Sequence, residues 1–317
     1  MKRTVNVLSK LNWGTRACAV LALCATTAIA LPAQIATLTT IHRFCSQSGC
    51  ADGDAPYAGL VQATNGGLYG TTYGGGTNSA GTIFKITPGG TLTTLYSFCP
   101  QTNCTDGLGP QAGLVQAANG GLYGTTQSGG ANVYYGTVFK ITPGGTLTTL
   151  YSFCSQTNCA DGANPWAGLV QAANEDLYGT TNSGGANGDY GFGTVFKITP
   201  SGTLTTLYSF CSQTNCTDGE GPGAGLVQAA NGDFYGTTVR GGNTGYGTVF
   251  KNHSGWHADD AIQVLLPDKL HGRRPTLREA GPGHQWGLLR DNRLWRGQRL
   301  WDGIQPVRGA WPDRAGG

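Results

Sequence analysis

The chain has 317 residues, of which 53 are Gly, and only 12% of its residues are charged. Glycine is costly inside helices, so this composition argues against an all-α protein. The formal net charge is +3, and no block of like charge suggests a tail that binds nucleic acid. We therefore expect a protein of strands and turns with no nucleic-acid partner.

Residues 1–30 have the plan of a secretory signal peptide. The first 16 residues carry four basic and no acidic side chains, an apolar run follows, and Ala28-Ile29-Ala30 offers a cleavage site between small residues. The apolar run is shorter than the ~20 residues of a membrane-spanning helix. We predict a secreted or cell-surface protein with no membrane span in the mature chain. An uncleaved anchor, or a lipoprotein site at Cys24, is the alternative.

Eight cysteines form four pairs of identical spacing. Four residues separate the members of each pair, and each first cysteine follows a Phe. The pairs are Cys45 and Cys50, Cys99 and Cys104, Cys154 and Cys159, and Cys211 and Cys216. A regular, even set of cysteines on an exported chain predicts local disulfides. Metal binding is the alternative, and it would require two pairs to meet without a nearby His.

Residues 31–251 contain one unit repeated four times. The first unit consists of AGLVQA from Ala58, GLYGTT from Gly67, GTIFKIT from Gly81 and TLTTLYSF from Thr91. The other units begin at Ala112, Ala167 and Ala224, and the fourth unit stops at Lys251 without a TLTTLYSF segment. A unit that recurs at this period predicts a repeat architecture.

Each segment is short and rich in β-branched and aromatic residues, which favours strands. Asn65-Gly66 and its equivalents predict a tight turn between the first two segments, and Pro88-Gly89-Gly90 predicts another between the last two. Four antiparallel strands in about 55 residues are typical of a β-propeller blade. We predict an all-β, propeller-like fold of about four blades in a ring that could be incomplete. A β-solenoid is the alternative, which the hairpin turns disfavour.

Residues 37–44, TLTTIHRF, are a spare copy of the last strand that precedes the first unit. The fourth unit lacks this strand, so the spare copy could pair with it and close a ring of four. An open arc would instead leave sheet edges exposed.

Two connections of each unit are long and variable. One joins the second and third strands, and the other joins successive units and holds the cysteine pair. In an up-and-down blade both lie on one face, where loops on a rigid scaffold usually carry function. The candidate binding residues there are Tyr57, Tyr73, Tyr134, Tyr135, Trp166, Tyr190 and Phe192. Aromatic rings can stack on sugars or pack on a partner protein; alternatively, these rings fill the junctions between blades.

An Asp-Gly pair follows the second cysteine of each pair. The four residues are Asp52, Asp106, Asp161 and Asp218. They could line the mouth of the ring or bind Ca²⁺, and the simpler alternative is an Asp-Gly turn. We expect no other cofactor and no further metal site.

The strings LVQAANGGLYGTT and GTVFKITPGGTLTTLYSF, with the Gly-Gly loop between them, resemble the GloVer tandem-repeat family. The resemblance covers roughly residues 37–251 in four copies. It implies an exported, propeller-like repeat protein, and it supplies no catalytic residues to carry over. The inserted cysteine pair departs from the usual repeat.

Catalytic constellations are sparse in the repeats. His42 is the only His between residues 31 and 251, which excludes a Ser-His-Asp site in every unit. We predict a non-enzymatic binding or scaffold module that contacts an extracellular glycan or a cell-surface protein through its loops. The alternative is an exported propeller enzyme, a lyase or hydrolase acting on a carbohydrate. Near-identical units disfavour it, because a catalytic site needs different polar groups at one place.

Residues 252–317 lose the repeat and contain four of the five His and five of the seven Trp. A shift of one base after Lys251 lets codons for residues 252–257 read I-T-P-G-G-T. The shifted frame continues into the missing last strand and most of a fifth unit. We interpret residues 252–317 as an out-of-frame, disordered tail, whether the extra base lies in the gene or arose in sequencing.

Overall fold

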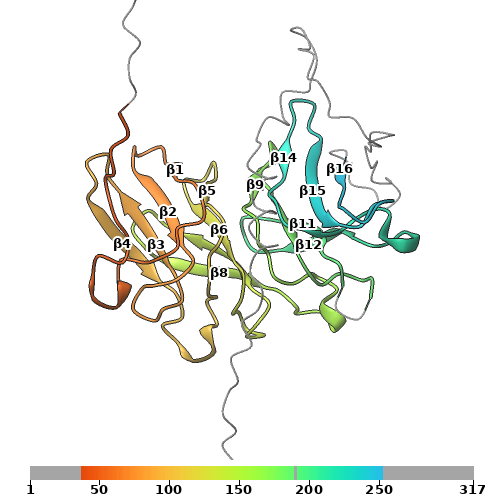
Figure 1. Ribbon diagram of the computed structural model, residues 1–317, viewed down its shortest axis with the longest axis horizontal. Coiled ribbons are helices and arrows are strands. Elements are labelled where there is room, and N and C mark those ends of the chain that lie inside the picture. Colours follow the sequence, from red (N-terminus) through yellow and green to blue (C-terminus); the bar gives the residue numbers. More distant parts are fainter. Residues whose placement is uncertain (1–36, 189–190, 253–317) are drawn as a thin grey trace, which may run out of the picture. The chain divides into compact units, whose positions relative to one another are not determined.

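The computed structural model describes residues 37–188 and 191–252. These residues contain no α-helix, and their strands form four antiparallel sheets of four strands each (Figure 1). Each sheet corresponds to one repeat unit, so the predicted all-β, propeller-like fold is confirmed. The signal peptide predicted at residues 1–30, Tyr190, and residues 253–317 of the tail predicted at 252–317 lie outside the described residues.

The first three sheets have the same order, with each strand beside the next in the chain. Sheet 1 contains β1 (Val61–Gln62), β2 (Leu68–Thr72), β3 (Thr82–Ile86) and β4 (Leu92–Ser97). Sheet 2 contains β5 (Val115–Gln116), β6 (Leu122–Thr126), β7 (Thr137–Ile141) and β8 (Leu147–Ser152). Sheet 3 contains β9 (Val170–Gln171), β10 (Leu177–Thr181), β11 (Thr194–Ile198) and β12 (Leu204–Ser209).

Sheet 4 is built differently. It contains β13 (Glu220–Pro222), β14 (Val227–Gln228), β15 (Phe234–Arg240) and β16 (Val249–Asn252), and β15 pairs with the other three. In sheets 1 to 3 the third strand also pairs with a fourth, whereas β16 pairs only with β15 within the described chain. Sheet 4 therefore has no outer strand among the described residues.

The hydrophobic core lies between successive sheets. Between sheets 1 and 2, Tyr69 and Ile83 pack in one buried cluster with Leu122 and Phe139. Equivalent clusters lie between sheets 2 and 3 and between sheets 3 and 4. We call the side of a sheet that faces the preceding unit its leading face and the other side its trailing face. Each sheet alternates side chains between these two faces, as the period of a strand requires.

Gly70 in β2 shows why the strand motif contains a glycine. A Cβ at this position would lie 2.5 Å from Cζ of Phe84, so the phenyl ring lies directly over the backbone. The equivalent glycines in sheets 2 to 4 lie under a Phe in the same way. The absence of a side chain on the second strand therefore leaves room for a large aromatic ring on the third.

A register shift interrupts the pairing of the third and fourth strands in sheets 1 to 3. In sheet 1, Phe84 pairs with Thr94 and Ile83 pairs with Tyr96, so Leu95 has no opposite residue. Such a bulge re-aims the residues that follow it. Here it precedes Tyr96, whose hydroxyl donates to the Asp106 carboxylate of the next loop. The sequence pattern did not predict this bulge.

Candidate functional site

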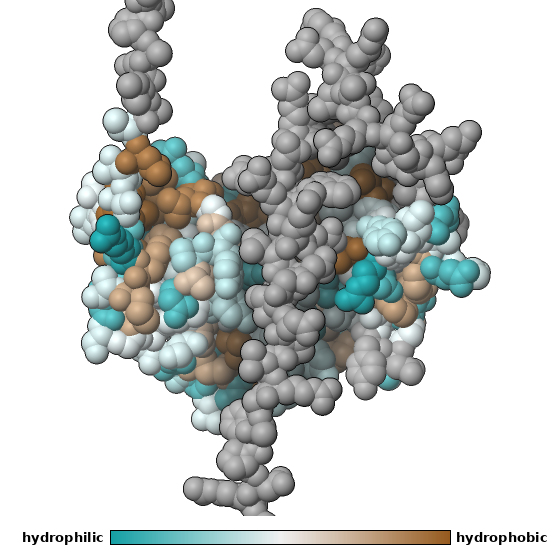
Figure 2. Space-filling model, viewed as in Figure 1, coloured by the Kyte–Doolittle hydropathy of each residue, from teal (hydrophilic) through white to brown (hydrophobic). Residues whose placement is uncertain are grey.

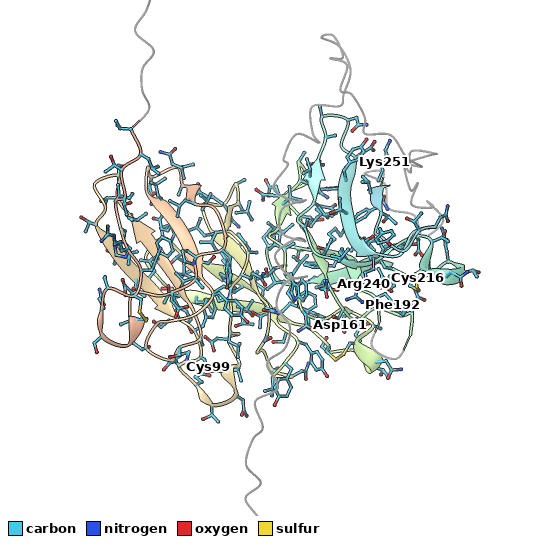
Figure 3. The ribbon with its side chains drawn as sticks, in the orientation of Figure 1. Cys99, Asp161, Phe192, Cys216, Arg240 and Lys251 are labelled. Atoms are coloured by element: carbon cyan, nitrogen blue, oxygen red, sulfur yellow. A yellow bond between two sulfur atoms is a disulfide. The ribbon has the colours of Figure 1, made fainter. Side chains whose placement is uncertain are left out.

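The long connections gather at one end of the sheets. We call residues 45–57, 99–111, 154–166 and 211–223 the Cys loops, and residues 73–80, 127–135, 182–192 and 239–246 the Gly loops. In each unit a Gly-loop amide donates to the second cysteine of the Cys loop, as from Gly130 to Cys104 at 2.9 Å. Figure 3 shows Cys99, Asp161, Cys216 and Arg240 at the end of the sheets opposite Lys251. Both sets of loops therefore share one face, as predicted.

Each of the first three Gly loops also contacts the Cys loop that follows it. The Asn132 side chain donates to the carbonyl of Cys154 at 2.8 Å, and the Asn164 side chain donates to the carbonyls of Gln127 and Tyr134. At the other two junctions the Cys-loop amides of Gly109 and Gly221 donate to the carbonyls of Ala80 and Phe192. The eight loops thus form a continuous layer, which we call the loop face.

Every Cys loop is closed by a disulfide, as predicted from the spacing. The bonds join Cys45 to Cys50, Cys99 to Cys104, Cys154 to Cys159 and Cys211 to Cys216. Each also contains a one-turn 3-10 helix, namely η1 (Ser48–Cys50), η2 (Thr102–Cys104), η3 (Thr157–Cys159) and η4 (Thr214–Cys216). All eight cysteines have positive φ, a conformation that non-glycine residues rarely adopt. Disulfides of this kind fit an oxidising compartment.

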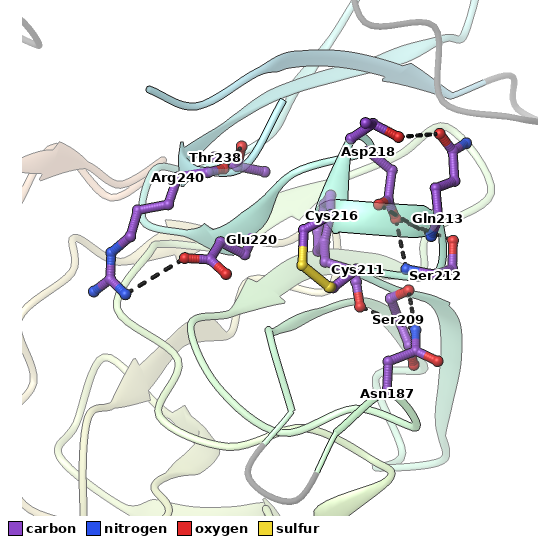
Figure 4. Close-up of a disulfide and its surroundings, with 12 residues drawn as sticks. Asn187, Ser209, Cys211, Ser212, Gln213, Cys216, Asp218, Glu220, Thr238 and Arg240 are labelled. Carbon is purple, nitrogen blue, oxygen red and sulfur yellow. Dashed lines mark hydrogen bonds and ion pairs between the residues drawn. A yellow bond between two sulfur atoms is a disulfide. The ribbon is translucent and has the colours of Figure 1, made fainter. Parts of the chain in front are cut away.

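The repeated aspartates point into the Cys loops. Asp218 accepts hydrogen bonds from the Ser212 amide and hydroxyl and from the Gln213 amide beside the disulfide (Figure 4). It also accepts a bond from the Tyr208 hydroxyl at 2.7 Å. Asp52 and Asp161 have the same serine and glutamine donors. Because the four carboxylates are only 0–7% exposed, a ligand could reach them only if the loop opened.

The same contacts shift the pKa values of the clamping groups. Burial, together with the hydrogen bond to Asp161 and the charge of that carboxylate, raises the pKa of Tyr151 to about 12 against the opposing bond from Ser155. Burial alone would raise the pKa of Asp52, but hydrogen bonds from Ser46 and Gln47 outweigh it and lower that pKa below its ordinary value. The raised pKa keeps the Tyr151 phenol neutral, and the lowered pKa keeps the Asp52 carboxyl ionised.

The second Cys loop has a weaker clamp. Pro100 stands where the other loops have serine, so it offers neither an amide N–H nor a hydroxyl. Asp106 accepts bonds from Tyr96 and Cys99, but its buried Oδ1 has no hydrogen-bond partner. The sequence alone could have indicated this difference, because the substitution is visible in the repeat.

The glycine of each Asp-Gly pair is required by packing. A Cβ on Gly162 would lie 2.5 Å from Oγ1 of Thr181 and 2.7 Å from Oγ1 of Thr194, and its φ is +97°. These two buried hydroxyls are themselves hydrogen bonded at 2.8 Å. The Asp of the pair thus places its carboxylate in the loop, and the Gly lets the loop pack directly on the sheet. Within the described chain, no group of three or more His, Cys, Asp or Glu side chains could hold a metal.

The outer surface of the loop face differs from unit to unit. The last residue of the first Cys loop, Tyr57, lies beside the first residue of the Gly loop of the same unit, Tyr73, with ring centroids 5.7 Å apart. The equivalent pairs of positions in the other units hold Gln111 and Gln127, Trp166 and Asn182, and Gly223 and Val239. The loop face therefore presents one variable pair of positions per unit on a repeated backbone.

The predicted aromatic residues fall into two groups. Tyr57 and Tyr134 are 67% and 71% exposed, and Trp166 and Tyr73 are 37% and 38% exposed. Tyr135 and Phe192 instead pack against the clusters between sheets, where they fill junctions. Tyr246, which is 89% exposed, was not among the residues predicted from the sequence. Its backbone bridge to Gly241 matches the bridge between Tyr134 and Gly129, so alignment of the Gly loops could have found it.

The described residues also form an open hollow of about 340 Å³ away from the variable pairs. It is lined by Thr40, Ile41, His42, Arg43 and Ser46 at the start of the described chain. His42 stands in the position of the clamping tyrosines, and its Nε2 lies 3.3 Å from Oδ2 of Asp52. This hollow therefore belongs to the first clamp.

The model of one repeat family, the Gloeobacter/Verrucomicrobia repeat, matches residues 99–265, more than half of the chain. The chain belongs to this repeat family. The Gloeobacter/Verrucomicrobia repeat thus corresponds to the sheets and loops described above, and the predicted resemblance is confirmed. A search of curated proteins finds no match to this sequence.

Several solved structures are weakly similar in fold. An α-L-arabinanase of Penicillium chrysogenum, complexed with arabinobiose, is 14% identical with a TM-score of 0.44, and the match covers 66% of each chain. A protein of unknown function from Dyadobacter fermentans is 14% identical with a TM-score of 0.41, over 64% of this chain and 66% of that one. An α-L-arabinofuranosidase of Clostridium thermocellum is 14% identical with a TM-score of 0.37, over 67% and 72%.

The present chain spans 66% of the arabinanase and of the Dyadobacter fermentans protein, which is just under two thirds of their length. Among the described residues, no helix is long and apolar enough to cross a membrane.

Proposed function

We propose that this chain is an exported, non-enzymatic binding module whose loop face contacts carbohydrate. The observation that carries the proposal is the set of variable, exposed side chains held on an otherwise repeated backbone. Tyr57, Tyr134 and Trp166 supply exposed rings, and aromatic faces are well suited to stack on sugar rings. The predicted signal peptide and the four disulfides support export.

A rigid frame favours binding because little freedom is lost when the ligand arrives. Each Cys loop is closed by a disulfide and clamped by an aspartate, and the last three are hydrogen bonded to the Gly loops on both sides. The variable side chains project from this layer. Gln127 and Asn182 stand where the first unit has Tyr73, and their amides can donate to and accept from sugar hydroxyls.

In this proposal the repeated aspartates act on the loops and not on the ligand. Asp161 is fully buried and accepts four hydrogen bonds from its own loop and from Tyr151. Replacing it should loosen the Cys loop. Replacing Trp166 should leave the loop intact and remove a contact surface.

The test is binding of the purified chain to a panel of soluble polysaccharides, followed by calorimetric titration of any ligand found. We expect Trp166→Ala and Tyr57→Ala to weaken binding by about tenfold each. Thr148→Ala, at an exposed position in β8, is the matched control and should bind as the wild type does.

Three results decide between classes of function. Binding that depends on Trp166 without release of sugar fragments supports the proposal. Release of fragments would contradict it in favour of a carbohydrate-active enzyme. Failure to bind any polysaccharide, together with capture of a cell-surface protein that Trp166→Ala abolishes, would replace the glycan by a protein partner.

A further inference from the structure

No described residue covers the trailing face of sheet 4. Val227 is 44% exposed, and Tyr235 and Val249 are partly exposed. The residues equivalent to Tyr235 in sheets 1 to 3 are only 0–4% exposed, and those equivalent to Val249 are fully buried, because the next sheet covers them. At this end, the described chain thus presents only one of the two faces that form a junction between sheets.

The leading face of sheet 1 is partly uncovered. Phe84 and Ile86 on this face are only 3–4% exposed, and Phe44 packs on Phe84. Leu60, however, is 50% exposed, whereas its equivalents Leu114, Leu169 and Leu226 are 6–8% exposed. Gln62 is exposed as well. Apolar residues accordingly gather at the surface over the first sheet in Figure 2. This face is the other half of the same junction.

The three junctions inside the chain show how these halves fit. Thr71 on the trailing face of sheet 1 donates its hydroxyl to the carbonyl of Ala112 on the leading face of sheet 2 at 2.9 Å. The same bond recurs from Thr125 and from Thr180 at the next two junctions. On the open faces, the donor position is Thr237 and the acceptor position is Ala58.

A second bond fixes the same register. Gln116 of sheet 2 accepts from the amide of Thr64 in sheet 1, and Gln171 accepts from Ala118. On the open faces the corresponding groups are Gln62 and the amide of Ala230. The open ends therefore match in apolar surface and in both polar contacts.

Residues 37–44 complete the match. Phe44 packs edge-on against Phe84 with centroids 5.1 Å apart, as Phe98 packs on Phe139 and Phe210 on Phe250. The segment thus holds the place of a last strand from a preceding unit, but within the described chain it is not part of a sheet. To join a sheet, this segment needs a third strand that has no fourth strand beside it. Within the described chain, β16 is such a strand.

We infer that two copies of this chain join head to tail at both ends. Sheet 4 of each copy packs on sheet 1 of the other, and residues 37–44 of each copy add to β16 of the other as the outer strand. The two interfaces are identical and related by a two-fold axis, so the assembly closes. The result is a ring of eight sheets, within the range of four to eight blades that propellers use.

A second copy is the occupant because the described chain leaves Leu60 at one end and Val227 at the other exposed. Residues 253–317 contain no TLTTLYSF segment that could serve as the missing strand. A second copy offers the strand and the packing face together, in the arrangement already used three times within the chain.

The test is the mass of the purified full chain by analytical ultracentrifugation, with three substitutions at exposed positions. Leu60→Asp alters the leading face, Val227→Asp alters the trailing face, and Tyr246→Asp on the loop face is the matched control. We expect the wild type and Tyr246→Asp to have twice the mass of one chain, and Leu60→Asp and Val227→Asp to have the mass of one. Unchanged circular dichroism would show that each variant is folded.

Mixing the two monomeric variants sharpens the test. Each variant keeps one unaltered end face, so the mixture should form a mixed dimer through one intact junction. A monomeric wild type would overturn the inference. That result is expected if one chain closes on itself, or if residues 253–317 cover the end faces of their own chain. Polymers that lengthen with concentration would also overturn it, since the ring would then not close.

Discussion

Sheets 1 to 3 and sheet 4 come from nearly the same sequence but differ in how completely they are built. In sheet 2, Ile141 at the end of the third strand is fully buried, and a fourth strand covers the edge. In sheet 4 the same position is Asn252, which is 4% exposed with an Oδ1 that has no partner. The comparison teaches that a repeat unit depends on its neighbours, because its own four segments do not bury both faces.

Sheet 4 carries two ion pairs, and one of them has an equivalent in sheet 3. Lys251 pairs with Asp233 at 2.8 Å, as Lys197 pairs with Asp176 at 3.4 Å, and Arg240 pairs with Glu220 at 3.4 Å. The Asp233 carboxylate raises the pKa of Lys251 above its ordinary value against an opposing effect of burial. The Arg240 side chain is 75% exposed, so its pair contributes little to stability, and neither ion pair replaces the missing strand.

The largest effect should come from removing the central ring of the third strand. Phe196→Ala in sheet 3 should destabilise the fold by about 3–5 kcal/mol, because it leaves a cavity between two covered sheets. Phe250→Ala in sheet 4 should cost less, since that sheet lacks an outer strand. Urea denaturation followed by circular dichroism measures both. Equal losses would contradict the difference between the two sheets.

Restoring the repeat at the end of β16 should have the next largest effect. Asn252→Ile removes a buried oxygen without a partner and adds apolar surface, so it should stabilise sheet 4 by about 1–3 kcal/mol. Asn252→Ala separates the two contributions, since it removes the oxygen and adds little surface. Thermal unfolding is the readout, and a lower midpoint for Asn252→Ile would show that the site does not accept an aliphatic side chain.

The tyrosine clamps predict a loss of stability in alkali. The folded-state pKa of Tyr151 is about 12, above the value of about 10 expected in the unfolded chain. The clamp therefore contributes fully below about pH 10 and less as the pH rises toward 12. Tyr151→Phe should flatten this fall in the unfolding midpoint. If the unfolding midpoint falls with pH as steeply in Tyr151→Phe as in the wild type, Tyr151 is not the cause of the fall.

The smallest effect is expected at the weakest clamp. Pro100→Ser gives the second Cys loop the donors found in the other three, so it should stabilise the protein by about 1 kcal/mol. The reciprocal change, Ser155→Pro, should destabilise the third loop by a similar amount. Differential scanning calorimetry of the two variants checks both signs. A stabilising Ser155→Pro would mean that the hydroxyl and amide donors do not matter.

Much of this fold could be predicted from the sequence because repetition makes each signal recur. The turn residues fix the hairpins, the spacing of cysteines fixes the disulfides, and loop lengths place the variable residues on one face. The bulge at Leu95 could not be predicted, since it depends on the contact between the Tyr96 hydroxyl and the Asp106 carboxylate of the next loop. The burial of Asp161 was also not visible, because an Asp-Gly pair in a turn can face either the loop or the solvent.

Aromatic residues of the loops show the same limit. Tyr134 and Tyr135 are adjacent and identical in type, yet the first is exposed and the second packs between sheets. Composition alone does not separate these roles. The backbone separates them, because Tyr134 forms a bridge with Gly129 just as Tyr246 forms one with Gly241 in a Gly loop of different length.

The most direct test of the dependence of each sheet on its neighbour is hydrogen exchange of the β16 amides at low and high protein concentration. The account predicts that β16 exchanges rapidly at low concentration and approaches the protection of β7 and β11 as a second copy supplies the outer strand. The same change should be absent in Leu60→Asp. Exchange of β16 that is independent of concentration, in the wild type as in the variant, would contradict the account.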